Sequence, residues 1–222
     1  LVLHAWWRLT ELFRQVCDRL AQAGFVALAP DLYQGKTTAS VEEAEALVGA
    51  LNREGERVDG DLAAALQVLR QHATSGQAND RGQFGVVGFS LGGAYALDMS
   101  VSPDAGIAAV VTFYSTYPGL DYGRTQAASL CHFAEHDPYE PAESAAQMQR
   151  EIQVAGRPVS TYTYPGTSHW FFEQNRPEYD VAAAQLAWER TTTLLSRWVC
   201  PLEQSRFLSR LVYDAVGCTT VR

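Results

Sequence analysis

The sequence predicts an α/β protein, with a mostly parallel sheet of about six strands and helices on both faces. Apolar runs alternate with segments of helical periodicity at short spacing along the chain. These apolar runs are continuous and lack the apolar–polar alternation of half-exposed strands, so we expect strands that are buried on both faces. No repeat or low-complexity tract interrupts the pattern, and one domain is expected over residues 1–200.

The first third of the chain is expected to form two strands and three helices. Leu12, Val16 and Leu20 share one stripe of the first helix, which Thr10 can cap and Gly24 can end. The expected strands are residues 1–4 and 25–29, and the expected helices are residues 11–23, 41–51 and 59–72.

The rest of the core continues the alternation after a polar loop. Short runs rich in valine, isoleucine and phenylalanine favour strands, and the segments between them carry apolar residues at helical intervals. The expected strands are residues 84–89, 107–114, 129–134 and 159–164, and the expected helices are residues 91–101, 140–154 and 178–199.

Residues 201–222 differ in character and are expected to be a C-terminal extension. Phe207, Leu208, Leu211 and Val212 recur at helical spacing, so one interpretation is a helix that packs on the core. The alternatives are a segment that mediates dimerisation and an extension without a role.

The charge balance argues against two classes of partner. Seventeen basic and 25 acidic residues give a net charge of −8, whereas nucleic-acid binders carry basic stripes and anionic membrane surfaces repel acidic proteins. No apolar run is long enough to span a bilayer and no signal peptide is recognised, so a cytoplasmic protein is expected. The cysteines lack metal-type spacing and are expected to be free thiols: Cys17, Cys131, Cys200 and Cys218.

A turn with the pattern G-x-S-x-G lies between an expected strand and an expected helix. It reads Gly88-Phe89-Ser90-Leu91-Gly92 and is typical of a nucleophile elbow, in which the glycines avoid collisions around a sharply turned serine. Such a turn lifts the Ser90 hydroxyl above the sheet and points the Leu91 backbone N–H at developing negative charge. The sequence therefore predicts Ser90 as a nucleophile, the alternative being a tight turn without chemistry.

A serine nucleophile needs a base, and the base needs an orienting acid. In a nucleophile-elbow protein the chain order is serine, acid, histidine. Asp137 and His169 follow two expected strands in that order, with Glu135 and Asp121 as alternative acids. The remaining histidines fit less well by position: His4 precedes the serine, His72 ends a helix, His132 lies within a strand where packing is expected, and His136 precedes Asp137.

No metal and no cofactor are expected. His132 and His136 are four residues apart, but they lie on a strand and its following loop, and no third ligand is evident. No phosphate-binding glycine motif follows a strand.

With these residues placed, residues 1–198 resemble the dienelactone hydrolase family of the α/β-hydrolase fold. The resemblance implies Ser90, Asp137 and His169 as a catalytic triad. It also implies the Trp6 backbone N–H as a second oxyanion donor beside Leu91. The segments that carry it are HAWWRLTELFR, GFVALAPDLYQGK, GVVGFSLGG, HFAEHDPYEP and YPGTSHWFFEQNRPEYDVAAAQLAWERT.

Several positions depart from the family pattern. The namesake enzymes carry cysteine at the position of Ser90 and glutamate at that of Ala5, so the chain resembles a serine-nucleophile variant. They hold an anionic lactone with arginines, one of them at the position of Glu173, which is expected to repel a substrate carboxylate. Arg8 replaces a family glycine and supplies either a cation or a solvent-facing side chain. The sheet is also expected to lack the strands that the family places before HAWW.

The expected reaction is hydrolysis of a small carboxylic ester or lactone through an acyl-enzyme, by a monomer or homodimer. Trp7, Arg8, Trp170 and Phe171 are expected to line the substrate pocket, and core packing is the alternative for several of the aromatic residues. The alternative functions are a general short-chain carboxylesterase or thioesterase and a catalytically silent small-molecule binding protein.

Overall fold

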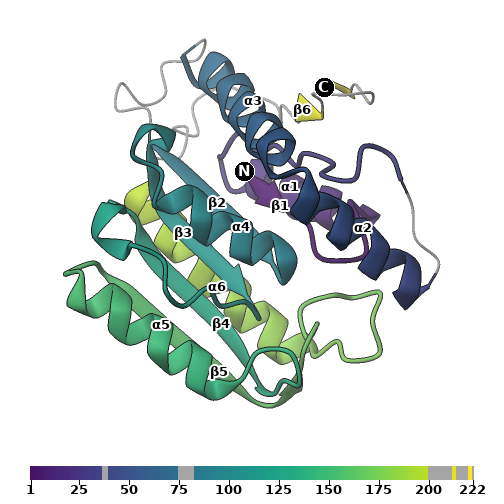
Figure 1. Cartoon of the computed structure of the whole chain (residues 1–222), viewed down its shortest axis with the longest axis vertical. Helices are drawn as coiled ribbons and strands as arrows, with labels where there is room; N and C mark the ends of the chain where they lie inside the picture. Colours follow the sequence, from purple (N-terminus) through teal and green to yellow (C-terminus); the bar gives the residue numbers. More distant parts are fainter. Residues whose placement is uncertain (37–39, 75–82, 200–211, 214–219, 222) are drawn as a thin grey trace. The chain divides into compact units, whose positions relative to one another are not determined.

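The structure, a computed structural model, describes residues 1–36, 40–74, 83–199, 212–213 and 220–221. The chain divides into two compact units (Figure 1). The first comprises Leu1–Gly82 and Pro201–Arg222, and the second comprises Gln83–Cys200. Among the described helices, none combines the length and the apolar character that crossing a bilayer requires.

The first unit begins with a short strand and continues as three helices. Helix α1 buries the predicted stripe of Leu12, Val16 and Leu20, and the chain leaves it through Gly24, whose φ of 92° suits glycine. The Ser40 hydroxyl caps α2 by accepting a hydrogen bond from the Glu43 N–H. The elements are β1 (Val2–Leu3), α1 (Glu11–Gln22), α2 (Val41–Arg53) and α3 (Gly55–Thr74).

The strand predicted at residues 25–29 is wrong. The segment is buried, as its apolar sequence requires, and the Leu28 carbonyl accepts a hydrogen bond from the Val2 N–H at 2.8 Å. It nevertheless forms no strand. Apolar sequence predicted burial correctly, but strand formation needs a repeated ladder of backbone bonds with a neighbour. The other five expected strands form, and the last of them continues to Ser168 where an end at residue 164 was predicted.

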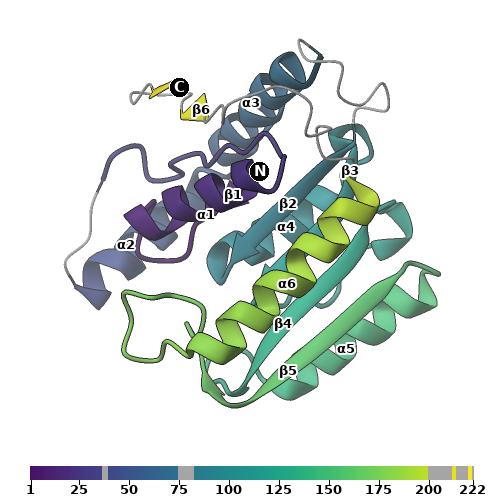
Figure 2. The ribbon, with the colours of Figure 1, turned by 180° about the vertical axis from the view of Figure 1, so that it is seen from behind.

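The second unit is an open α/β arrangement built on four parallel strands in the order β2-β3-β4-β5. Helices α4 and α5 lie in front of these strands in Figure 1 and α6 lies in front of them in Figure 2, so both faces are covered. The elements are β2 (Phe84–Phe89), α4 (Leu91–Ser100), η1 (Pro103–Ala105), β3 (Ile107–Phe113), η2 (Tyr122–Arg124), β4 (Ala128–His136), α5 (Ala142–Val154), β5 (Val159–Ser168) and α6 (Val181–Trp198).

The continuous apolar strands are buried as predicted. Every residue of β3 is buried, whereas much of β5, at the end of the strand order, is exposed. Parallel strands present their carboxyl ends at one edge of a sheet, where ligands bind. Ser90, Tyr114, Asp137 and His169 directly follow β2, β3, β4 and β5. This edge is therefore where polar side chains from four segments gather.

Little of the C-terminal extension is described. Val212–Tyr213 (β6) and Thr220–Val221 (β7) pair as antiparallel strands, so Val212 lies in a strand where helical spacing predicted a helix. The other residues of that predicted helix, Phe207, Leu208 and Leu211, lie outside the described residues, as do Cys200 and Cys218.

Candidate active site

The elbow at Ser90 combines a strained backbone with very close chain packing. Ser90 has φ 49° and ψ −117°, a conformation that side-chain-bearing residues rarely adopt. A Cβ placed on Gly88 would lie 2.2 Å from the Gly92 carbonyl oxygen, and one on Gly93 would lie 2.5 Å from the Ser115 Cβ. These contacts explain why glycine stands at both positions. Such strain costs about 1–3 kcal/mol and is concentrated at functional sites.

Ser90 precedes the first residue of α4, so the first N–H groups of that helix have no acceptor within the helix. The Ser90 N–H instead donates to the Phe113 carbonyl at 3.0 Å, which anchors the elbow to the end of β3. Leu91 is the first residue of the helix. Its N–H is therefore available, by helix geometry, to a negatively charged ligand atom beside the Ser90 hydroxyl.

The structure brings Ser90, Asp137 and His169 into one hydrogen-bonded line. His169 Nε2 lies 3.1 Å from Ser90 Oγ, and His169 Nδ1 lies 2.8 Å from Asp137 Oδ2 and 2.9 Å from Oδ1. Because an ionised carboxylate only accepts hydrogen bonds, Nδ1 carries the proton and Nε2 is free to accept the serine O–H. The side chains of His169 and Asp137 are each 3 % exposed, so little water competes for these bonds.

Asp137 is held by its own loop. Its Oδ1 accepts hydrogen bonds from the backbone N–H groups of Tyr139 at 3.0 Å and Glu140 at 3.1 Å. The alternative acids are bonded elsewhere: Glu135 accepts from the Gly166 N–H, and Asp121 accepts from the Gly123 N–H within η2. Asp137 is thus the acid that contacts His169.

Three aromatic rings surround the His169 imidazole. The ring centroids of Tyr114, Tyr139 and Trp170 lie 4.6, 4.9 and 4.9 Å from that of His169. Trp170 and Tyr114 both have positive φ, 70° and 40°, which is unusual for bulky residues. Sequence reasoning singled out Trp170 but missed Tyr114 and Tyr139. The position of Tyr114 directly after a strand was the signal that could have identified it.

Glu173 is buried in the structure. It is 2 % exposed, and its Oε1 accepts a hydrogen bond from the Tyr114 hydroxyl at 2.8 Å. Burial raises the pKa of the Glu173 carboxyl to about 7, against the hydrogen bond from Tyr114 and the nearby charge of Arg176, which lower it. Burial and the Glu173 charge likewise raise the pKa of Tyr114 well above its ordinary value. Glu173 is therefore a buried partner of Tyr114.

Glu140 is a second carboxyl near Asp137 whose ionisation is disfavoured. Burial, together with the Asp137 charge, raises the pKa of Glu140 to about 7, although a hydrogen bond from the Thr116 hydroxyl at 2.6 Å opposes this shift. Sequence reasoning missed this residue, because its burial depends on how α5 and the β4 loop pack.

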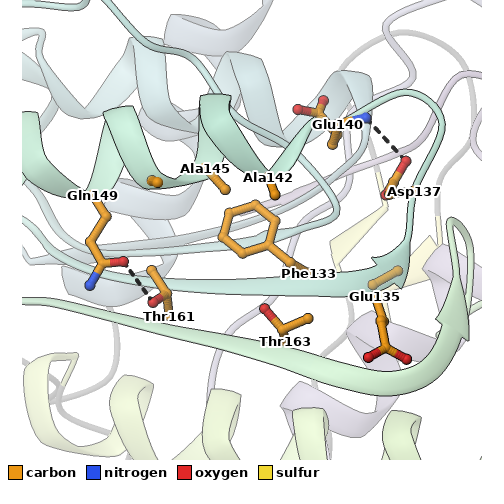
Figure 3. A pocket seen from close by; sticks show the side chains of 11 residues that line it. Phe133, Glu135, Asp137, Glu140, Ala142, Ala145, Gln149, Thr161 and Thr163 are labelled. Carbon is orange, nitrogen blue, oxygen red and sulfur yellow. Dashed lines mark hydrogen bonds between the residues drawn. The ribbon is translucent and has the colours of Figure 1, made fainter.

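A pocket of about 250 Å³ lies between α5 and the strands β4 and β5, with Asp137 among its lining residues (Figure 3). Phe133 forms its centre, and the hydrogen-bonded pair Gln149 and Thr161 lies at one end. Ser90 and His169 do not line it, so it is separate from the reacting atoms of the candidate site. The lining residues are Phe133, Ala134, Glu135, Asp137, Glu140, Ala142, Ala145, Ala146, Gln149, Thr161 and Thr163.

The other predicted pocket residues lie in two places. Phe171 is fully buried and packs on Tyr114 and Tyr164, whereas Trp170 lies against His169. Trp6, Trp7 and Arg8 belong to the first unit, where the Trp6 carbonyl accepts a hydrogen bond from Tyr33 and Arg8 is exposed. The Trp6 oxyanion donor and the substrate contacts of Trp7, Arg8, Trp170 and Phe171 stay predictions.

Two other histidines have structural partners. His132 is fully buried, with Nδ1 2.8 Å from the Tyr164 hydroxyl and Nε2 3.1 Å from Thr191 Oγ1, and burial lowers its pKa to about 3. His4 Nε2 accepts a hydrogen bond from the Leu32 N–H, and burial also lowers the pKa of this histidine. The packing predicted for His132 is confirmed.

Metal-type clusters do not occur among the described residues: no three histidine, cysteine, aspartate or glutamate side chains gather in a ligating arrangement there. His132 and His136 do not form a pair, because His132 is buried and the His136 side chain is 69 % exposed beside Glu135. Cys17 and Cys131 are buried free thiols, and burial raises their pKa to about 12 and about 11. Neither thiol has the lowered pKa of a reactive cysteine.

Comparison with known proteins gives a consistent picture. A sequence profile of the dienelactone hydrolase family matches residues 1–199. A probable 2-oxo-3-(5-oxofuran-2-ylidene)propanoate lactonase of Bradyrhizobium sp. is 30% identical over 214 residues, which cover 89% of this chain and 82% of the relative. A carboxymethylenebutenolidase of Rhodococcus opacus is 25% identical over 204 residues, which cover 86% and 77% of the two chains. The crystal structure of a putative dienelactone hydrolase from Klebsiella pneumoniae has the same fold, with a TM-score of 0.73, 21% identity, and coverage of 89% and 85%.

Proposed function

The chain belongs to the dienelactone hydrolase family, and on this premise we propose that it hydrolyses small carboxylic esters or lactones through an acyl-enzyme on Ser90. In this proposal it is a serine-nucleophile variant of the family. Asp137 and His169 complete a catalytic triad with Ser90.

The observation that carries the proposal is the line of hydrogen bonds from Ser90 Oγ through His169 to Asp137. The two donor–acceptor distances of 3.1 and 2.8 Å lie within hydrogen-bond reach, as proton transfer requires. The strained φ of Ser90 adds support, because a strained elbow lifts the hydroxyl out of the sheet toward the imidazole.

The first half of the reaction forms the acyl-enzyme. His169 Nε2 takes the Ser90 proton while Ser90 Oγ attacks the substrate carbonyl carbon. The positive charge that develops on the imidazole is stabilised by the Asp137 carboxylate, whose bond to Nδ1 also fixes the tautomer. His169 then passes the proton to the leaving alcohol oxygen, and the carbon–oxygen bond of the ester breaks.

The oxyanion of the tetrahedral intermediate is stabilised at the start of α4. The Leu91 N–H and the helix dipole face the developing charge, and the Trp6 N–H is the second donor that the family resemblance implies. Removing one such donor costs about 2.7–4 kcal/mol of transition-state stabilisation. In the second half of the reaction a water attacks the acyl carbon with His169 as the base, which releases the acid and restores Ser90.

The proposed substrates are neutral near the scissile bond. Three carboxyl groups lie close to His169 or to its direct partners: Asp137 bonds the imidazole, Glu140 donates its N–H to Asp137, and Glu173 accepts from Tyr114. Burial already disfavours ionisation of Glu140 and Glu173, and the Asp137 charge disfavours that of Glu140 further. A substrate carboxylate would therefore place an unfavourable negative charge in this region. The name of the lactonase relative points to lactones, and this chain is proposed to accept uncharged members of that class.

The proposal is tested by hydrolysis of p-nitrophenyl acetate, p-nitrophenyl butyrate and a neutral aromatic lactone by the wild type and Ser90→Ala. Turnover that is lost in the variant, while its circular dichroism spectrum and melting temperature stay unchanged, supports a serine hydrolase. Equal turnover in both proteins refutes Ser90 as the nucleophile. Binding of these compounds without turnover in either protein would instead support the silent binding protein.

Substrate charge is tested separately with mono-p-nitrophenyl succinate, an ester that carries a free carboxylate. We expect kcat/KM at least about tenfold below that for the neutral butyrate, in a ratio that shrinks as salt concentration rises. A preference for the anionic ester would contradict a neutral substrate class.

A further inference from the structure

Glu173 is anchored in the segment that follows His169. Its N–H donates to the Trp170 carbonyl at 2.8 Å and its carbonyl accepts from the Arg176 N–H at 2.9 Å. Phe171 N–H donates to the Ser168 carbonyl at 3.1 Å within the same succession of turns. The Glu173 backbone is therefore fixed relative to the His169 backbone by short-range hydrogen bonds.

The Tyr114 phenol links this segment to the end of β3. Its hydroxyl donates to Glu173 at 2.8 Å across 59 residues, and its backbone N–H donates to the His132 carbonyl at 2.7 Å. Tyr114 is fully buried and adopts a positive φ of 40°. A bulky residue keeps such a conformation only where surrounding contacts compensate for the strain, and the buried bond to Glu173 is one of these contacts.

The same phenol ring lies against the His169 imidazole. The two ring centroids are 4.6 Å apart at an interplanar angle of 51°. His169 Nδ1 bonds Asp137 and His169 Nε2 bonds Ser90. With these two bonds alone, the imidazole could still rotate about the line through its two nitrogen atoms. The Tyr114 ring, which has the shortest centroid distance of the three rings around His169, restricts that rotation together with Tyr139 and Trp170.

We propose that Glu173 is a positioning residue: through the Tyr114 phenol it fixes the plane of the His169 imidazole. This role presupposes the proposed function, in which His169 moves the Ser90 proton. Glu173 does not contact the reacting atoms, and its effect on turnover passes through Tyr114.

Glu173 could act through its charge as well as through its hydrogen bond to Tyr114, and two substitutions distinguish these effects. Arg176 favours the ionised carboxyl, Glu178 disfavours it, and Asp137 together with Glu173 disfavours ionisation of Tyr114. Glutamine at position 173 keeps an oxygen that can accept the Tyr114 hydroxyl but carries no charge. Leucine at this position removes the acceptor.

The experiment compares wild type, Glu173→Gln and Glu173→Leu on p-nitrophenyl butyrate, with Glu189→Leu as a matched control. Glu189 is an exposed residue of α6 whose carboxylate accepts a hydrogen bond from the Gln185 side chain. We expect Glu173→Leu to lower kcat about 10- to 100-fold with KM changed less than about threefold, because small misplacements of catalytic groups have effects of this size. Glu173→Gln is expected to restore kcat to within about threefold of wild type, and Glu189→Leu to leave it unchanged.

A second variant and a second readout keep the test decisive. Tyr114→Phe removes only the hydroxyl and is expected to lower kcat like Glu173→Leu, which serves if the leucine variant does not fold. The downfield NMR resonance of the His169 Nδ1 proton, bonded to Asp137, is expected to broaden in both variants and to stay sharp in Glu173→Gln. If the wild type shows no turnover that depends on Ser90, the proposed function fails, while this resonance still tests the positioning.

The opposite results overturn the proposal. They are a folded Glu173→Leu with wild-type kcat and an unchanged Nδ1 resonance, or a loss of kcat in Glu173→Gln as large as in Glu173→Leu. The first would show that the imidazole is held without Glu173. The second would show that the charge, not the hydrogen bond, is what matters.

Discussion

Gly88→Ala is expected to disable the elbow while the rest of the fold persists. The new Cβ would lie 2.2 Å from the Gly92 carbonyl oxygen, 2.5 Å from its carbon and 2.6 Å from the Gly93 Cα. All three are backbone atoms in the first turn of α4, so no side-chain rotation can relieve the overlap. Restoring ordinary van der Waals separation requires that turn to move by about 1 Å.

This displacement gives the expected magnitudes. Overpacking of this kind costs about 1–3 kcal/mol, which corresponds to a fall in melting temperature of about 2–4 °C per kcal/mol for a chain of this size. Because Ser90 begins the displaced turn, a shift of about 1 Å is expected to lower kcat/KM by about 100-fold. The larger effect should therefore be on turnover and not on stability.

The assay pairs p-nitrophenyl butyrate hydrolysis with thermal unfolding followed by circular dichroism. Gly60→Ala is the matched control, because a Cβ there meets nothing within 4 Å and the residue lies inside α3. The control is expected to keep its turnover and to gain up to about 1 kcal/mol from helix propensity. Wild-type kcat/KM and melting temperature in Gly88→Ala would refute the steric reasoning.

Three further outcomes are expected. Asp137→Asn should lower kcat about 10³- to 10⁴-fold, since an amide that donates to Nδ1 favours the wrong tautomer of His169; near-wild-type turnover in a folded variant would contradict this. His132 has a pKa of about 3 in the folded protein against an ordinary value of 6.5, so it takes up a proton when the protein unfolds. The free energy of unfolding should therefore fall as pH drops from about 6.5 toward 3. In His132→Gln, the free energy of unfolding from urea titrations should depend less steeply on pH over that range. Glu173 has a folded pKa of about 7 against an ordinary value of 4.5, so it keeps its proton in the native state and makes stability fall as pH rises from 4.5 to 7. The melting temperature of Glu173→Gln, measured relative to wild type, should therefore increase between pH 5 and pH 8. A difference that stays constant over this range would argue against the raised pKa.

The positions of the site residues follow from the topology of the second unit. Parallel strands end at a common edge, so residues that directly follow β2, β4 and β5 meet there although Ser90 and His169 are 79 residues apart. The same topology places Tyr114, which follows β3, where its ring packs against His169 and its hydroxyl donates to Glu173. Strand order thus determines which side chains can meet, and the turns after each strand determine which atoms do.

The sequence by itself determined the alternation of elements and the residues at the carboxyl ends of the strands. Strand β2 has the predicted bounds, and α1, α4 and β3 end within one residue of them, because apolar periodicity and glycine placement act through neighbouring residues. The G-x-S-x-G spacing likewise pointed to the turn at Ser90, since the collisions that exclude side chains at Gly88 involve residues only four or five positions away.

Only the tertiary structure decided the contacts that depend on distant parts of the chain. The buried run at residues 25–29 could form a strand only if a partner supplied a full ladder, which no local pattern encodes. Glu173 was expected to repel substrate, but its burial against Tyr114, and with it a pKa near 7, arises from packing between segments 59 residues apart. Local sequence specifies which conformations a segment prefers, whereas burial and pairing depend on which other segments come to lie against it.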